Sequence, residues 1–248
     1  MIKTFGNSWK RVIAIILGVV FLATPGTIGF AAAASSLFSK NVVLSAEKFA
    51  QGCPSCKNDI NSKAVEYAKN MGLSTELVAG DEAQRYLGLF QSQGLSNLGE
   101  KLSVYKVAKV KPNNYVYVSG AFKEPMNDTI LYAAINGNTD EVLMLKTVKY
   151  DGGDSVSVKD FLNNGAITSV SFKEINKSNE HLKQSLDEFM KKNDPGSVTT
   201  LIDWYSWCCS FAGILACGTG CAVFFEFPPL YVACDSMCNY FWSTGLCS

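Results

Sequence analysis

The segment from Leu201 to Ser248 contains no lysine, arginine or histidine. Its charged residues are Asp203, Glu226 and Asp235, whereas about a quarter of its residues are aromatic. The electrostatic attraction of a cationic amphipathic peptide to anionic lipid is therefore excluded for this segment. The whole chain balances 22 basic against 22 acidic residues, so no net field favours nucleic acid as a partner.

Sequence motifs of enzymes are also scarce. The chain has one histidine, His181, which lies beside Glu180 and Lys183 on the polar side of a predicted helix and is expected to be solvated. No phosphate loop, nucleophile elbow or metal-ligand motif is present. Asp81 and Asp160 are typical of helix caps. The sequence therefore predicts a protein that is not an enzyme and that binds no cofactor and no metal.

The N-terminal apolar run is too short for a membrane span. Val12 to Leu22 is preceded by three basic residues and followed by a stretch of small residues, whereas a spanning helix needs roughly 20 apolar residues. This pattern predicts a secretory signal peptide over residues 1–34, cleaved near Ala33 or Ala34, and a secreted product. The alternative is an uncleaved N-terminal anchor. Export would bring the cysteines into a compartment where disulfides persist.

The residues between 35 and 192 predict a soluble α+β domain. Runs rich in β-branched and aromatic residues predict an antiparallel sheet with flanking helices on one face. The predicted strands are Ser103–Val110, Tyr115–Phe122, Thr129–Asn136, Glu141–Val148 and Ala166–Phe172, with a hairpin turn at Asn136–Thr139. The predicted helices are Val42–Gly72 with an interruption, Asp81–Ser92, Val156–Asn163 and Ser178–Lys192.

A polar segment with a Pro-Gly pair, residues 193–200, is the clearest linker in the chain. It separates the charged domain from the apolar, cysteine-dense segment 201–248. Exposed segments of this composition are preferred sites of proteolysis. We therefore expect a processing protease to act here.

Seven of the nine cysteines lie in the segment 201–248, spaced as mirror images about Pro228-Pro229. Cysteines four residues apart share one face of a helix, so two such faces can meet in a ladder of disulfides across a helical hairpin. The mirror spacing predicts the pairs Cys221–Cys234, Cys217–Cys238 and Cys208–Cys247. Cys-x3-Cys spacing in an exported chain favours disulfides over a zinc site.

The outermost pair has an alternative. Mirror symmetry selects Cys208 as the partner of Cys247, but helical phase places Cys209 nearer the face of Cys217. Either assignment leaves one cysteine over, as a free thiol or as a link in a dimer. Each disulfide typically contributes about 2–4 kcal/mol, which a peptide of this size needs in order to stay folded.

The arms of the predicted hairpin run from Ser210 to Phe225 and from Leu230 to Trp242. Small residues on the first arm, among them Gly213 and Gly218, offer a surface that another helix can approach closely. Aromatic rings gather at the ends of the arms and at the tip, where rings sit well at a membrane interface. The predicted membrane contacts are Trp204, Trp207, Phe224, Phe225, Phe227 and Trp242.

The same segment carries a family resemblance. Its adjacent cysteines Cys208-Cys209, its run Ala216–Cys221 and its ending from Cys238-Asn239 to Leu246-Cys247 resemble the small cysteine-rich halocins, bacteriocins of haloarchaea with relatives in bacteria. The resemblance implies an exported precursor whose C-terminal cysteine-rich part is the antimicrobial peptide. It also implies an immunity or protective role for the preceding region.

A second chemical signal is Cys53-Pro-Ser-Cys56. A Cys-x-x-Cys at the start of a helix can hold the reactive thiolate of a thiol-disulfide oxidoreductase. An oxidoreductase of this kind would have a strand directly before the motif, whereas the sequence predicts a helix over Ser45 to Gln51. The alternatives for Cys53 and Cys56 are a local disulfide or a bond to the spare cysteine of the tail.

Together these patterns predict the exported precursor of a bacteriocin-like peptide that acts on the membrane of a target cell. Its expected partners are that membrane, its own N-terminal domain as a shielding or immunity partner, and the processing protease. The alternative is an envelope or surface protein whose apolar tail anchors it or binds a partner.

Overall fold

The computed structural model describes residues 40–52, 60–95, 104–108, 117–124, 129–150, 152–193, 204–224 and 227–247. The predicted signal peptide, Cys53 and Cys56, the linker 193–200 beyond its first residue, and Phe225 lie outside these residues. Trp204 and Cys208 are described for their backbone alone.

The predicted α+β architecture is confirmed. The strands of the described residues form one antiparallel sheet of seven, in which each strand pairs with the next along the chain. They are β1 (Ser74–Val78), β2 (Val104–Ala108), β3 (Tyr117–Glu124), β4 (Thr129–Asn136), β5 (Glu141–Tyr150), β6 (Ser155–Asp160) and β7 (Ala166–Ser171).

The turn between β4 and β5 lies where the Asn-Gly sequence predicts it. The backbone N–H of Asp140 donates to the carbonyl of Asn136 at 2.8 Å, and the N–H of Asn138 donates to the Asn136 side chain at 3.0 Å. Asp140 takes the left-handed conformation, with φ 57°. Aspartate tolerates that conformation better than most residues, so it closes this longer turn.

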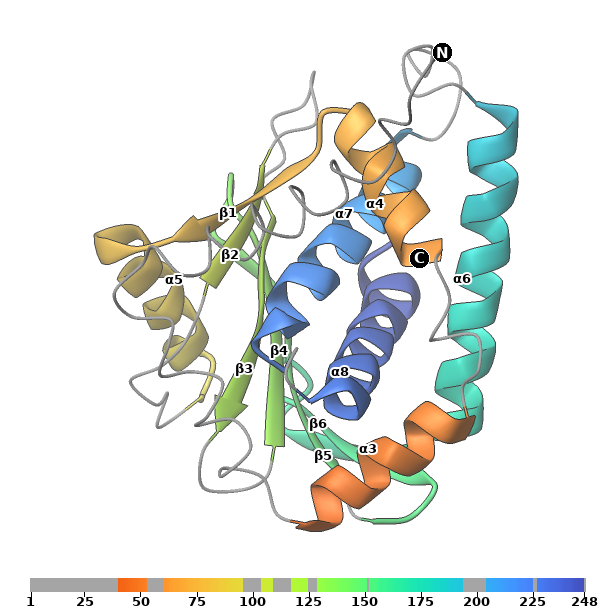
Figure 1. The fold of residues 1–248 in the computed structure, drawn as a ribbon. Helices are drawn as coiled ribbons and strands as arrows, with labels where there is room; N and C mark the ends of the chain where they lie inside the picture. The colour runs from red at the N-terminus through yellow and green to blue at the C-terminus, as the bar shows by residue number, and fades with distance from the viewer. Residues whose placement is uncertain are drawn as a thin grey trace, which may run out of the picture.

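Helices cover both faces of the sheet, whereas the sequence predicted helices on one face. Helix α5 (Gly80–Ser92) packs on one face, where Tyr86 and Phe90 meet Leu131 and Leu145. The other face carries α3 (Lys40–Gly52), α4 (Ile60–Asn70), α6 (Phe172–Lys192) and the C-terminal hairpin (Figure 1). Successive residues of a strand point to opposite faces, and every residue from Thr129 to Ile135 of β4 is buried, so both faces of β4 are covered.

The predicted helix Val156–Asn163 is wrong. This segment forms β6 and the turn after it, with Val156 and Val158 buried and the residues beside them exposed or half-buried. Alternation of buried and exposed residues is the pattern of a strand with one buried face. Strand β1 was not predicted, and α6 begins six residues earlier than predicted, where the Ser171 hydroxyl accepts from the N–H of Glu174 at 3.1 Å.

The hairpin lies at the centre of the fold. Its helices α7 (Trp204–Gly220) and α8 (Pro228–Phe241) lie between the sheet and α6, with α3 and α4 near their ends (Figure 1). One cluster of buried side chains joins Ile130, Tyr132 and Val148 of the sheet to the cysteines of the hairpin. The hairpin therefore shares one hydrophobic core with the face of the sheet that it covers.

Candidate functional site

The hairpin is built from two helices of apolar and small residues. Helix α7 continues into a 3₁₀ turn at Cys221–Phe224, and α8 begins directly at Pro228 and Pro229. Proline fits the first turn of a helix, because its fixed φ suits the helix and its missing N–H would have no intrahelical partner. A π-type turn at Trp242–Leu246 follows α8 and brings the chain to Cys247.

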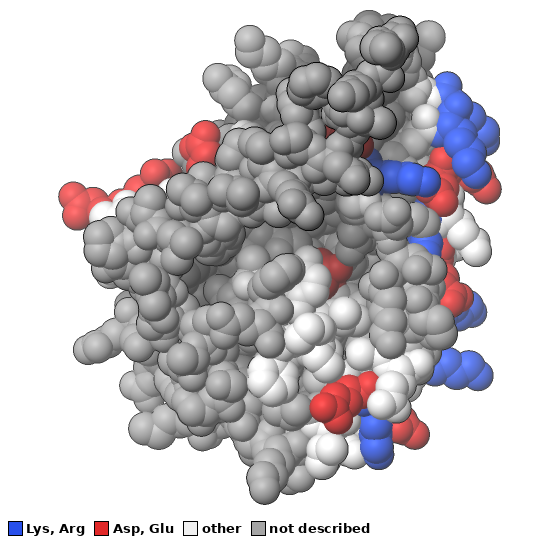
Figure 2. Space-filling model, viewed as in Figure 1, with Lys and Arg blue, Asp and Glu red and all other residues white. Residues whose placement is uncertain are grey.

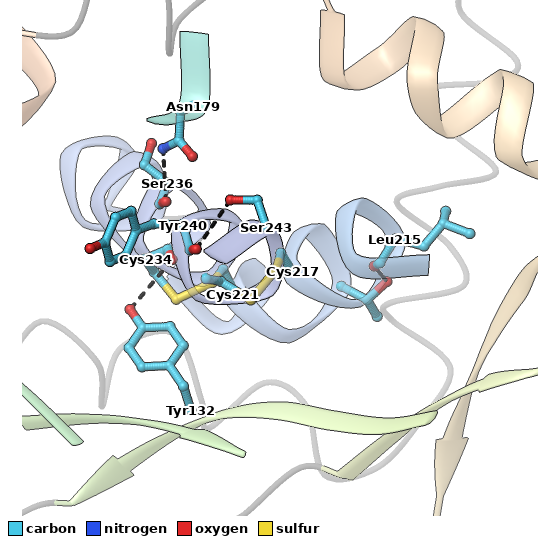
Figure 3. Close-up of a disulfide and its surroundings, with 11 residues drawn as sticks. Tyr132, Asn179, Leu215, Cys217, Cys221, Cys234, Ser236, Tyr240 and Ser243 are labelled. Atoms are coloured by element: carbon cyan, nitrogen blue, oxygen red, sulfur yellow. Dashed lines mark hydrogen bonds between the residues drawn. A yellow bond between two sulfur atoms is a disulfide. The ribbon is translucent and has the colours of Figure 1, made fainter. Parts of the chain in front are cut away.

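Three disulfides of the described residues join the two arms in nested order. They are Cys221–Cys234, Cys217–Cys238 and Cys209–Cys247, with Cα–Cα distances of 5.7, 5.5 and 5.6 Å. The two inner pairs are those that the mirror spacing predicts. Their cysteines lie four residues apart on each helix, so both bonds form along one contact face (Figure 3).

The prediction of Cys208 as the partner of Cys247 is wrong, and its stated alternative Cys209 takes the position. The physical reason is helical phase. At 3.6 residues per turn, a residue eight positions before Cys217 lies closer to its face than one nine positions before it. The π-type turn then places Cys247 at that face, with its N–H donating to the carbonyl of Trp242 at 3.0 Å.

Gly213 allows the two arms to approach closely. A Cβ atom at this position would lie 3.0–3.1 Å from atoms of Trp242, and the Trp242 side chain is 1% exposed. The small-residue surface predicted on α7 therefore faces, at Gly213, the second arm of the same hairpin.

Helix α6 contacts α8 through polar groups (Figure 3). The Asn179 amide donates to the carbonyl of Ser236 at 2.8 Å, and the hydroxyls of Ser178 and Ser243 are hydrogen-bonded at 3.4 Å. Nearby, the Tyr240 hydroxyl donates to the Glu174 carboxylate at 3.0 Å. These contacts follow one side of α8 and of the π-type turn after it, over about two turns in all.

The sheet contacts α8 from the opposite side. The hydroxyl of Tyr132 on β4 donates to the carbonyl of Cys234 at 3.4 Å (Figure 3). The ring of Tyr132 meets the ring of Phe241 edge to face, with centroids 5.3 Å apart. None of these contacts was predicted. For the contacts of α6 with the hairpin, one sequence signal existed: Glu174 and Ser178 lie four residues apart and so share one face of the helix.

Aromatic side chains fix the first arm. Trp207 of α7 stacks on Phe189 of α6 with ring centroids 4.2 Å apart, and Phe211 stacks on Tyr67 of α4 at 5.1 Å. Further along α7, the hydroxyls of Thr219 and of Thr75 on β1 lie 3.2 Å apart. Helices α4 and α6 and the sheet edge thus hold α7 along its length.

Four of the six side chains predicted to contact a membrane are described, and these four are buried or half-buried in this structure. Phe224 and Trp242 are both 1% exposed, Phe227 is half-buried, and Trp207 lies against Phe189. The side chains of Trp204 and Phe225 lie outside the described residues. Contact between these residues and lipid stays a prediction about the hairpin after its release.

Burial changes the acid–base properties of the tyrosines at this interface. Desolvation raises the pKa of Tyr132 and of Tyr150, and the neighbouring Tyr150 adds to the rise at Tyr132. Desolvation and the carboxylate of Asp235, which is itself 6% exposed, raise the pKa of Tyr231 to about 12. All three hydroxyls are therefore neutral at physiological pH.

The surface of α6 differs from its inner side. Figure 2 shows lysine side chains interleaved with acidic ones at the right of the view, where Figure 1 places the outer side of α6. Two charged neighbours on this helix, Lys192 and Glu188, lie 3.8 Å apart and are mostly exposed. The outer surface of α6 is thus charged, whereas its inner side contacts the hairpin.

Within the described part of the chain, no helix combines the length and the apolar character that crossing a membrane requires. Among the same residues, no three metal-ligating side chains are grouped as a candidate site. The redox prediction for Cys53 and Cys56 lies outside the described residues. Comparison of the chain with protein-family models, with curated proteins and with solved structures finds no match.

Proposed function

We propose that the chain is the exported precursor of a bacteriocin-like peptide. The hairpin, residues 204–247, is the antimicrobial part. The cradle, by which we mean the described residues from 40 to 193 around the hairpin, keeps its apolar surface out of water until a protease cuts the linker 193–200.

The observation that carries this proposal is the difference between the covalent and the non-covalent links of the hairpin. All three disulfides of the described residues join one arm of the hairpin to the other. Its contacts with the cradle are hydrogen bonds and packed side chains, such as Asn179 with Ser236 and Phe189 with Trp207. Among the described residues, every link between the hairpin and the cradle other than the chain itself is non-covalent, so cutting the linker would leave a cross-linked peptide held by these contacts.

The composition of the hairpin supports a membrane as its target. From Phe211 to Cys217 every residue is buried, and so is every residue from Ala233 to Asn239. Separation from the cradle would expose to water those parts of these surfaces that face the cradle, and burying apolar area again contributes roughly 25 cal/mol per Å². A lipid bilayer offers such a burial site to a segment that has no basic residue.

Export agrees with the chemistry of the cysteines. Disulfides persist in oxidising compartments outside the cytosol, and the hairpin contains three among the described residues. The signal-like residues 1–34 supply the route, and the product is a secreted peptide that associates with membranes.

The test uses the exported full-length protein with a site for a sequence-specific protease placed in residues 193–200. Cleaved and uncleaved protein are added to vesicles loaded with a dye and to sensitive cells. We expect dye release and killing from the cleaved protein and little of either from the uncleaved one. A sample reduced and alkylated before cleavage is the control, and it should lose activity because the hairpin then unfolds.

Two outcomes would contradict the proposal. The first is a cleaved protein that neither kills cells nor releases dye, even after the hairpin has been separated from the cradle under denaturing conditions. The second is a full-length protein that stays in the membrane of the producing cell, which would favour the anchoring alternative.

A further inference from the structure

The sequence offers two adjacent cysteines of α7 for one partner in this hairpin. Cys208 and Cys209 follow each other on α7, and Cys247 is bonded to Cys209. Six cysteines can already pair in roughly 15 ways, and a seventh adds to that number. The rotation of α7 about its own axis decides which of the two neighbours meets Cys247, because consecutive helical residues lie about 100° apart.

The cradle holds α7 at the residue just before these cysteines. Trp207 stacks on Phe189 with ring centroids 4.2 Å apart, and Phe211, four residues on, is fully buried against Tyr67. Two anchors on one face of a helix fix its rotation. Phe189 and Tyr67 belong to α6 and α4, so the cradle sets which of the two cysteines faces Cys247.

The cradle also sets the position of α8 along its axis and its rotation about that axis. On the α6 side, Asn179 binds the carbonyl of Ser236 and Ser178 binds the hydroxyl of Ser243. On the sheet side, Tyr132 binds the carbonyl of Cys234, one of the bonded cysteines. Sliding α8 by one residue would break these contacts together, so the cradle favours a single register of the ladder.

We propose that the cradle is the folding template that selects the disulfide pairing of the hairpin. It brings Cys209, Cys217 and Cys221 opposite Cys247, Cys238 and Cys234 before the bonds form. Mispaired forms would have to leave this packing, in which five of the six bonded cysteines are at most 5% exposed and Cys247 is half-buried. This role concerns how the hairpin is made and holds whatever the hairpin does after release.

The chemistry of each bond needs an external oxidant. Two cysteine thiols lose two protons and two electrons, and a disulfide-bearing oxidant of the compartment, either a small molecule or an oxidoreductase, accepts them and becomes two thiols. One cysteine thiolate attacks the oxidant, and its partner then displaces the reduced thiol from the mixed disulfide. The cradle itself accepts no electrons. It decides which second thiol is within reach.

The experiment refolds the reduced, denatured full-length chain in a buffer of reduced and oxidised glutathione and maps the disulfides by mass spectrometry. The wild-type chain should return to the three observed pairs. The variant Phe189→Ala, combined with Asn179→Ala, should raise the ratio of Cys208–Cys247 to Cys209–Cys247. We expect a rise of about five-fold or more, because the loss of one such contact typically changes an equilibrium ratio by about that factor. Glu188→Ala, on the exposed side of the same helix, is the matched control and should pair as wild type.

Two further variants separate mispairing from simple failure to fold. Adding Cys208→Ser to the double variant removes the competitor, and recovery of the three observed pairs would show that this chain still folds. Cys209→Ser in an otherwise intact chain should leave Cys247 as a free thiol, because the cradle holds α7 in the wrong rotation for Cys208. Wild-type pairing in the double variant, or efficient Cys208–Cys247 formation in Cys209→Ser, would overturn the proposal.

Discussion

At the scale of single residues, Gly213 sets how closely the two arms of the hairpin approach. We predict that Gly213→Ala lowers the free energy of unfolding by about 1 kcal/mol, because the overpacking against Trp242, roughly 1–3 kcal/mol, exceeds the gain in helix propensity of about 1 kcal/mol. Denaturant unfolding with the disulfides intact measures this change.

The matched control for that variant is Gly218→Ala on the same helix. A Cβ there would have its nearest neighbour, the Tyr231 hydroxyl, at 4.0 Å, which is an ordinary contact. Gly218→Ala should therefore raise stability by up to about 1 kcal/mol through helix propensity. Equal effects of the two substitutions would show that Trp242 yields easily and that Gly213 does not limit the approach.

The candidate site was predictable to the extent that it depends on spacing. Four-residue spacing on both helices gave Cys217–Cys238 and Cys221–Cys234, because helical periodicity and mirror symmetry agree there. At the outer pair the two criteria disagree, and periodicity decides for Cys209. The contacts of Asn179 and Tyr132 with the hairpin join residues far apart in sequence, so no local pattern could predict them.

At the scale of secondary-structure elements, β6 shows where a short pattern is ambiguous. Its sequence Ser-Val-Ser-Val-Lys-Asp alternates like a strand, but the following Phe161 and Leu162 also complete a helix-like apolar spacing. Pairing with β5 from Val156–Tyr150 to Asp160–Lys146 settles it as a strand. Longer patterns, such as those of β4, β5 and α6, distinguish a helix from a strand more clearly, and the sequence predicted these elements correctly as strands and as a helix.

The strand assignment of β6 leads to a prediction. Val158→Ala should lower the free energy of unfolding by about 2 kcal/mol, because the side chain is 3% exposed and its removal leaves a cavity in the core. Ser155→Ala, three residues earlier and on the opposite face of β6, should change it by less than about 0.5 kcal/mol. Thermal or denaturant unfolding of the two variants compares them directly, and similar losses at both positions would contradict the strand.

At the scale of the whole molecule, the sheet and the hairpin bury each other's apolar side chains. The inner face of the sheet presents Ile130, Tyr132 and Val148 to a cluster that includes the bonded cysteines. Helix α6 closes the opposite side with polar contacts at its centre and aromatic ones near its end. Covalent cleavage of the linker removes none of these contacts, so cleavage and release are separate steps.

A prediction about the cleaved protein follows from that separation. After cleavage in residues 193–200, the hairpin and the cradle should elute together from a size-exclusion column at neutral pH, because the interface remains buried. Addition of lipid vesicles should transfer the hairpin to the lipid fraction. A cleaved protein that falls apart without lipid would show that the cradle contributes little to holding the hairpin.

The same complex should weaken as the pH rises above about 10, the ordinary pKa of a tyrosine. Burial raises the pKa of Tyr132, Tyr150 and Tyr231, so their neutral forms stabilise the closed state below that pH. The stabilisation is lost as the pH passes from about 10 towards the raised values, because exposed tyrosines then ionise and buried ones do not. Tyr132→Phe removes one ionising group at the interface and should move the dissociation of the cleaved complex, followed by size exclusion across this pH range, to higher pH. An unchanged midpoint would show that Tyr132 is not one of the groups whose ionisation opens the interface.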